Sequence, residues 1–137
     1  MPGAPHRAAP WNTDELRDSL LALHQAGWAH SVEVWDGGEL IGGVFGTGMG
    51  TIFSAESTFH RRPGAGKVAI ADLGRRLART RPEAPIDVQV PSDYSTNLGA
   101  APLSRTEFLA TVADVDLPLV PATGVFARRP VWGWGRG

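Results

Sequence analysis

The segment FHRRPGAGK, residues 59–67, leads into a helix-forming stretch and could bind an anion. Gly64 and Gly66 let the backbone approach a ligand closely, and the backbone N–H groups at the start of a helix suit negative charge. Three basic residues add positive charge to the same segment: Arg61, Arg62 and Lys67. The segment is therefore a candidate anion site, and several phosphate-bearing ligands could occupy it.

Basic residues concentrate between positions 61 and 81, although the net charge of the chain is −1. In this interval Asp72 is the single acidic residue, and there are seven basic residues: Arg61, Arg62, Lys67, Arg75, Arg76, Arg79 and Arg81. Such a run is either a solvated helix face or a local phosphate-binding patch, because affinity for nucleic acid depends on where the charge lies as well as on its total.

Composition limits the classes of function that remain. The 137 residues, 42% of them hydrophobic, are enough for one folded domain, and the absence of cysteine excludes disulfides, thiolate metal sites and cysteine nucleophiles. No apolar run is long enough to span a membrane, and no leader peptide is recognisable. The four histidines lack ligand spacing with carboxylates, so we expect no metal. We expect a cytoplasmic protein.

The pattern of elements predicts an α+β fold. A helix should follow Thr13 and end at Gly27; residues 31–35 and 39–46 should form a hairpin, and residues 51–55 a third strand. Helix 66–80, strand 85–90, a polar turn, a helix capped by Ser104 and one or two strands in 115–126 should follow. This order predicts a mostly antiparallel sheet, flanked by helices, with one βαβ step. The sheet resembles that of the acetyltransferase-like (GNAT) fold.

Two general phosphate motifs can be compared with the loop. A P-loop would require glycine at position 61 and serine or threonine at position 68, where the chain has Arg61 and Val68. The pattern with which GNAT acyltransferases hold the pyrophosphate of CoA, [QR]-x-x-G-x-[GA], is matched by Arg61, Gly64 and Gly66. The P-loop is therefore excluded, and an acyl-CoA ligand stays open.

The residues around the loop resemble the leucyl/phenylalanyl-tRNA–protein transferase family. The matching motifs occur in order from about Leu16 to Arg129: AHSVEVW (29–35), LIGGVFG (40–46), ESTF (56–59), GKVA (66–69), DVQV (87–90), LGA (98–100) and the R-x-x-F of Arg105 and Phe108. The resemblance implies a GNAT-like domain that needs no cofactor. It also implies transfer of an aminoacyl group from the 3′ end of a charged tRNA to an amine.

The resemblance also implies roles for individual residues. Asp87 and Gln89, two apart on a predicted strand and so on one face of it, would hold and orient the reacting amine. Glu56 would either receive a substrate amine or anchor the loop through Arg61 or Arg62. The apolar pocket for the transferred side chain would involve Val44, Thr58, Ile70 and Leu73, although Ile70 and Leu73 suit the core equally well. Contacts to tRNA phosphates would come from Arg61, Arg62, Gly64, Gly66, Lys67 and Arg75.

Several positions depart from the family pattern. We expect no counterpart of the family's additional N-terminal domain; Thr58 stands where a larger apolar residue is usual, and Tyr94 replaces a common histidine. We therefore expect an aminoacyl-tRNA-dependent enzyme that acts on a small amine or a peptide and could dimerise to complete its site. A protein N-terminal transferase, an acyl-CoA N-acyltransferase and a non-catalytic tRNA-end-binding module are the alternatives. Residues 11–130 should form the domain, between a disordered segment, 1–10, and a flexible tail, 131–137.

Overall fold

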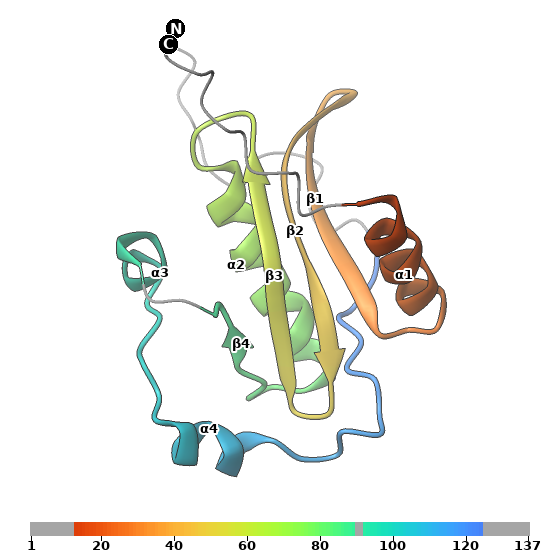
Figure 1. Cartoon of the computed structure of the whole chain (residues 1–137). Helices are drawn as coiled ribbons and strands as arrows, with labels where there is room; N and C mark the ends of the chain where they lie inside the picture. Colours follow the sequence, from red (N-terminus) through yellow and green to blue (C-terminus); the bar gives the residue numbers. More distant parts are fainter. Residues whose placement is uncertain (1–12, 90–91, 125–137) are drawn as a thin grey trace, which may run out of the picture.

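A computed structural model describes residues 13–89 and 92–124 (Figure 1). Its elements are α1 (Asp14–Gln25), β1 (Ala29–Asp36), β2 (Glu39–Met49), β3 (Ile52–His60), α2 (Ala65–Thr80), β4 (Ile86–Asp87), α3 (Asp93–Asn97) and α4 (Arg105–Thr111). The strands form one mixed sheet in the order β1-β2-β3-β4, with helices beside it. The predicted α+β class is confirmed, whereas the GNAT likeness and the domain boundaries stay predictions. None of the described helices has the length and apolar character needed to cross a membrane.

The first helix and the hairpin form where the sequence predicts them. The Thr13 hydroxyl accepts a hydrogen bond of 3.2 Å from the backbone N–H of Leu16, so it satisfies one of the free donors at the start of α1. Strands β1 and β2 pair in antiparallel register from Ala29–Thr47 to Asp36–Glu39. The tight turn between them brings the carboxylates of Asp36 and Glu39 side by side, and both form ion pairs with Arg62, as described below.

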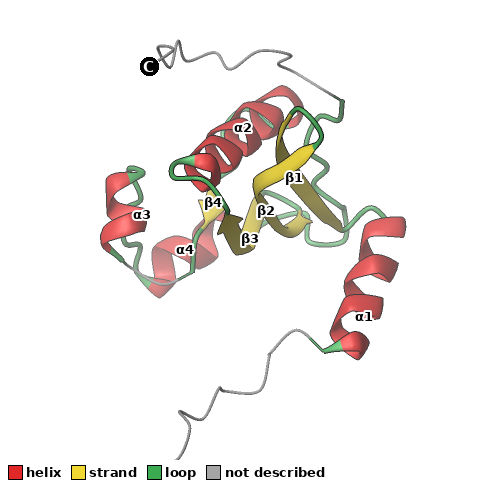
Figure 2. Cartoon of the chain, turned by 90° about the horizontal axis from the view of Figure 1, so that it is seen from above, coloured by secondary structure: helices red, strands yellow, loops and turns green. Residues whose placement is uncertain are grey.

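One face of the sheet packs against α2 and forms the core (Figure 2). Ala69, Leu73 and Leu77 of α2 are at most 1% exposed, and they pack with Phe53 of β3 and Val44 of β2. These positions follow the helical period of the apolar stripe, which explains why α2 lies along the sheet. Burial against the sheet thus fixes the start of α2, where the basic loop ends.

The segment after α4 crosses the end of the sheet near Gly48 without forming the predicted strands. Within residues 115–124 there is one isolated bridge, between Pro118 and Met49, while the backbone N–H of Leu119 donates to Gly48 at 3.1 Å. A Cβ at Gly48 would lie 2.0 Å from the Leu119 carbonyl oxygen, so the close approach requires glycine. The expectation of strands here is wrong through residue 124; residues 125 and 126 lie outside the described part of the chain.

Strand β4 is shorter than predicted, and this opens the sheet beside β3. The βαβ step is confirmed, because β3 and β4 are parallel, but their only pairs are Phe53–Ile86 and Ser54–Asp87. From Ala55 to His60, β3 has no strand beside it on that side within the described residues. Helix α3 lies on this open side of β3 (Figure 1).

Candidate functional site

The predicted strand 85–90 ends at Asp87, and the chain turns sharply there. Gln89 has φ = 70°, in the left-handed region that non-glycine residues rarely adopt. The Asp87 carboxylate accepts a hydrogen bond of 2.7 Å from the backbone N–H of Gln89 and so stabilises this turn. The expectation that both side chains leave one face of a strand is therefore wrong: Asp87 holds the backbone of Gln89, and the Gln89 side chain turns toward β3.

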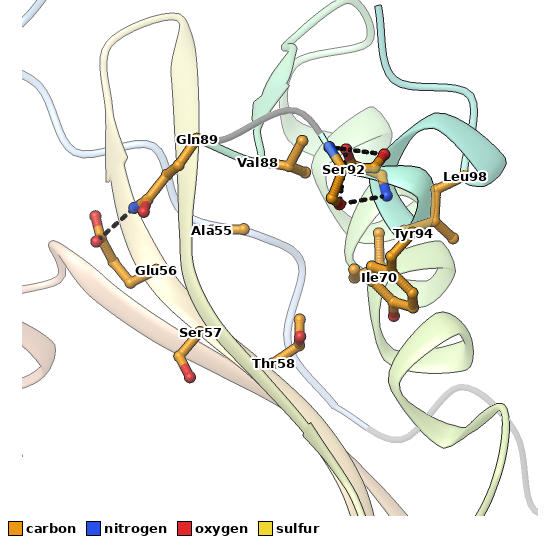
Figure 3. Close-up of a pocket in the computed structure, with 11 residues that line it drawn as sticks. Ala55, Glu56, Ser57, Thr58, Ile70, Val88, Gln89, Ser92, Tyr94 and Leu98 are labelled. Atoms are coloured by element: carbon orange, nitrogen blue, oxygen red, sulfur yellow. Dashed lines mark hydrogen bonds between the residues drawn. The ribbon is translucent and has the colours of Figure 1, made fainter. Parts of the chain in front are cut away.

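Glu56 meets Gln89 because β3 carries a bulge at that point. Phe45 pairs with Ser57 and Gly46 with Ala55, so Glu56 is the extra residue that faces no partner. Bulges of this kind change the direction of a side chain and occur next to active sites. The side-chain amide of Gln89 donates a hydrogen bond of 2.7 Å to Glu56 (Figure 3). The two residues thus form one polar group at the open edge of β3.

The second oxygen of Glu56 accepts a hydrogen bond of 3.1 Å from the Ser54 hydroxyl. No ion pair joins Glu56 to Arg61 or Arg62 in the described parts of the chain. Of the two roles predicted for Glu56, the anchoring of the loop therefore has no support, and the reception of a substrate amine remains a prediction.

A small pocket of about 140 Å³ lies between β3, α2 and α3 and opens beside this pair (Figure 3). Its walls are Ala55, Glu56, Ser57, Thr58, Ile70, Val88, Gln89, Ser92, Tyr94, Ser95 and Leu98. Of the four residues expected to hold an aminoacyl side chain, Thr58 and Ile70 line the pocket. Val44 and Leu73 belong to the core, 2% and 1% exposed, and lie outside the pocket lining.

Tyr94 is a wall of this pocket that the sequence interpretation treated only as a departure from the family pattern. It belongs to α3, and its hydroxyl would be 3.2 Å from a Cβ at Gly66, so α3 closes against the start of α2. Burial raises the pKa of the Tyr94 phenol above its ordinary value. The signal for α3 was present, because Ser92 and Ser95 form a reciprocal capping box. Serine in place of the usual Glu or Gln at the third helical position explains why a turn was predicted.

The predicted phosphate-binding cations in and next to the loop before α2 differ in whether they form ion pairs. Arg62 forms ion pairs with Asp36 and with Glu39, the latter at 3.0 Å, and the hydrogen bond to Asp36 raises the pKa of Arg62 above its ordinary value. Arg61 and Lys67 are exposed, and no ion pair joins either to another described residue. Arg62 therefore ties the loop to the β1–β2 turn, whereas Arg61 and Lys67 stay accessible to an anion.

The glycines and the remaining arginines can also be placed. Gly64 is the residue before α2, with φ = 84° and no side-chain cap, and Gly66 is buried under Tyr94. Arg75 is exposed on α2, while Arg76 pairs with Asp72 at 2.6 Å and donates to the carbonyl of Ala122. The positive face of α2 is thus smaller than its sequence indicates.

Comparison with known proteins decides the family. The model of the leucyl/phenylalanyl-tRNA protein transferases matches residues 3–113. The chain belongs to this family. Three similar relatives carry the name leucyl/phenylalanyl-tRNA–protein transferase. The protein of Pseudomonas fluorescens (strain SBW25) is 45% identical over 79% of this chain and 48% of its own length. The protein of Tolumonas auensis is 42% identical over 82% of this chain and 47% of its own length. The protein of Xylella fastidiosa (strain 9a5c) is 44% identical over 79% of this chain and 46% of its own length.

The chain spans about half the length of these curated relatives. The match to the leucyl/phenylalanyl-tRNA protein transferase model nevertheless includes the bulge at Glu56, the basic loop, Gln89 and all of α3 and α4. The recognised resemblance is confirmed. The pocket, the polar pair and the accessible cations therefore all lie within the segment that defines membership of the family.

Proposed function

We propose that this chain catalyses transfer of an aminoacyl group from the 3′ end of a charged tRNA to an amine. The hydrogen bond between Gln89 and Glu56 at the mouth of the β3–α3 pocket is the observation that carries the proposal. Membership of a family named for tRNA-dependent transfer supports the donor. We also propose that the sheet, which is open beside β3, has the arrangement of a GNAT sheet.

The reaction needs few protein groups, because an aminoacyl ester is already activated. The amine nitrogen attacks the ester carbonyl carbon, the new C–N bond forms, and the C–O bond to the ribose breaks. The proton lost by the amine is taken up by the departing ribose oxygen, which becomes a hydroxyl. A free α-amine with an ordinary pKa near ~8 is partly neutral at physiological pH, so the protein has only to position it and stabilise the oxyanion.

Gln89 and Glu56 can position that amine. The Glu56 carboxylate fixes the orientation of the Gln89 amide, which leaves the amide oxygen of Gln89 able to accept a hydrogen bond from the attacking nitrogen. Asp87 acts one step further away, because it holds the backbone of Gln89 in its strained conformation. Asp87 is therefore a positioning residue in this proposal, and Gln89 and Glu56 are the candidate catalytic residues.

The donor would occupy the pocket and the loop together. The aminoacyl side chain would enter between Thr58, Ile70 and Tyr94, while the phosphates of the tRNA end would contact Arg61 and Lys67. The volume of about 140 Å³ suits one amino-acid side chain. The Thr58 and Tyr94 hydroxyls favour a side chain other than a purely apolar one, because polar groups left without a partner penalise an apolar ligand.

The acceptor that the relatives' name supports is a protein. We propose a protein or peptide N-terminus as the amine, in preference to the small-molecule amine predicted from the departures in sequence. No specific observation favours the acyl-CoA donor or a non-catalytic role over tRNA-dependent transfer.

The test is transfer from tRNA pools charged with labelled amino acids to hydroxylamine and to short peptides, with Gln89→Ala as the control. We expect acceptor-dependent loss of label from tRNA for at least one amino acid and about 100-fold slower loss in Gln89→Ala. Equal rates in the two proteins for every pool would contradict the proposal, and acetyl-CoA would then be tested as the donor.

A further inference from the structure

Ser54 of β3 lies where the regular sheet ends and the candidate site begins. It pairs with Thr47 of β2 on one side and with Asp87 of β4 on the other. The Ser54–Asp87 pair is the last one between β3 and β4, and β3 continues beyond it to the bulge at Glu56. Ser54 is therefore a residue of the paired sheet placed directly beside the irregular backbone of the site.

The backbone of Ser54 is held by the close approach of β2. A Cβ at Gly46 would lie 1.9 Å from the carbonyl oxygen of Ser54, so this approach requires glycine. Gly46 pairs with Ala55, the residue directly before the bulge, and Ser54 itself is half-buried. Because strands pair with it on both sides, Ser54 presents its side chain from a fixed position.

The Ser54 hydroxyl is directed at the Glu56 carboxylate. It donates a hydrogen bond of 3.1 Å to Oε1 of Glu56, and it makes no other hydrogen bond to a described residue. Gln89 donates to the other oxygen, Oε2, at 2.7 Å (Figure 3). The terminal torsion of a glutamate has broad preferences, and Glu56 is exposed, so a single contact would leave its carboxylate free to rotate. The serine hydroxyl supplies the second contact.

The Ser54–Asp87 pair thereby holds Gln89 at two points. Asp87 accepts a hydrogen bond of 2.7 Å from the backbone N–H of Gln89, where φ is 70°. Ser54 acts on the side chain of Gln89 through Glu56. The backbone and the side-chain amide of Gln89 are thus fixed separately, and both constraints begin at the same pair of residues in the sheet.

We propose that Ser54 is a positioning residue for the transfer reaction. Its hydroxyl fixes the Glu56 carboxylate, which in turn orients the Gln89 amide toward the attacking amine. This inference rests on the proposed function and adds a residue that acts through Glu56 and not on a substrate. A displacement of about 1 Å in a site lowers a rate by as much as about 100-fold, so we expect loss of this hydroxyl to lower kcat about tenfold.

The experiment compares two substitutions of nearly equal shape at Ser54. Ser54→Thr keeps the hydroxyl and Ser54→Val replaces it with a methyl group, and both β-branched side chains suit a strand. The rate of transfer from charged tRNA to hydroxylamine is measured with the 137-residue protein, after subtraction of the rate without protein. We expect kcat about tenfold lower in Ser54→Val than in Ser54→Thr, with equal KM for tRNA. Thr47→Val makes the same chemical change at the paired position on β2 and should leave kcat unchanged.

A double-mutant cycle tests whether Ser54 acts through Glu56. Each Ser54 variant is combined with Glu56→Ala, which removes the carboxylate that the hydroxyl holds. The difference in kcat between valine and threonine at position 54 should then disappear, because the two residues act in series. A difference that persists in Glu56→Ala would overturn the inference.

The orientation of Gln89 can also be followed without any transfer. The chain has two glutamines, Gln25 and Gln89, so the side-chain amide signals of Gln89 in a 15N NMR spectrum are identified by their loss in Gln89→Ala. We expect these signals to lie apart from those of the exposed Gln25, to stay in place in Ser54→Thr and to move toward them in Ser54→Val. Unchanged Gln89 signals in Ser54→Val would contradict the proposed role.

The outcomes separate this inference from the proposed function. Absence of transfer from every charged tRNA would overturn the proposed function, and a displaced Gln89 signal in Ser54→Val would then still support the hold of Ser54 on the Glu56–Gln89 pair. Ser54→Ala, which removes the hydroxyl without adding volume, replaces Ser54→Val in each comparison if the valine variant does not fold. Equal kcat with and without the hydroxyl, in a protein that does transfer, would overturn the role of Ser54 and keep the transferase.

Discussion

The side-chain amide of Gln89 donates a hydrogen bond of 2.7 Å to Glu56, a residue 33 positions earlier in the chain. Each partner owes its position to an irregularity of the backbone: Glu56 lies at a bulge in β3, and Gln89, two residues after the end of β4, has a positive φ. Backbone strain of this kind persists where the surrounding structure enforces it, and it is common at functional sites. This pair lies at the mouth of the pocket between β3, α2 and α3.

Two substitutions at Gln89 should separate strain from chemistry. Gln89→Ala and Gln89→Gly both remove the amide, so both should slow transfer by about 100-fold. Because φ at this position is 70°, the glycine variant should be the more stable of the two by about 1 kcal/mol in urea unfolding. An alanine variant as stable as the glycine variant would show that the position is not strained.

Val44 and Thr58 face each other in register across β2 and β3 but should respond differently to the same chemical change. Val44 is 2% exposed, so Val44→Thr buries a hydroxyl in the core and should cost about 1–3 kcal/mol of unfolding free energy. Thr58 is exposed and lines the pocket, so Thr58→Val should change stability by less than about 0.5 kcal/mol and shift the donor preference toward apolar amino acids. Urea unfolding and transfer from individually charged tRNAs measure the two effects. A stable Val44→Thr variant would contradict the core assignment.

The basic loop should show unequal contributions to tRNA binding. Removal of one cation that binds a phosphate of a single strand reduces the slope of log affinity against log salt by about 0.7. Arg61→Gln and Lys67→Gln should each produce this reduction, because both side chains are accessible. Arg62→Gln should change the slope less, because Asp36 and Glu39 already neutralise that charge. Filter binding over a series of salt concentrations makes the comparison, and an equal reduction in all three variants would contradict it.

Tyr94 is the single tyrosine of the chain, so its ionisation can be followed directly by absorbance. Burial raises its pKa above the ordinary value of 10.0. A raised pKa means that the folded protein holds the phenolic proton more tightly than the unfolded chain does. The contribution to stability is therefore complete below pH 10 and is lost as the pH rises through the pKa of the folded state. We expect a midpoint above 10.0, a decline in stability above that pH, and a smaller decline in Tyr94→Phe; a midpoint at or below 10.0 would contradict the effect of partial burial on this phenol.

The regular part of the fold follows from local signals in the sequence. The Thr13 cap, the alternating hairpin and the apolar stripe of α2 each depend on residues close together in the chain, and the structure has all three elements. The Ser104 and Glu107 capping box likewise marks the start of α4. Local physics therefore predicts where these elements begin, and it also brings the basic loop to the start of α2.

The site itself depends on features that no local pattern specifies. The bulge at Glu56 arises from the pairing of β3 with β2, and the turn at Gln89 ends a strand whose alternation favoured continuation. The ion pairs of Arg62 join it to residues 23 and 26 positions away, so a count of cations overstated the free charge. The family motifs indicate Gln89 and Glu56 as candidate site residues, whereas the contact between them becomes visible only in the three-dimensional arrangement.

The most direct test of the central claim is single-turnover transfer from charged tRNA to hydroxylamine, with the unmodified protein beside Gln89→Ala and Glu56→Ala. The account predicts hydroxamate formation from at least one aminoacyl-tRNA, slowed about 100-fold in Gln89→Ala and to a similar extent in Glu56→Ala, because the two side chains act as a pair. Hydroxamate formation at the same rate in all three proteins, or in none, would contradict it.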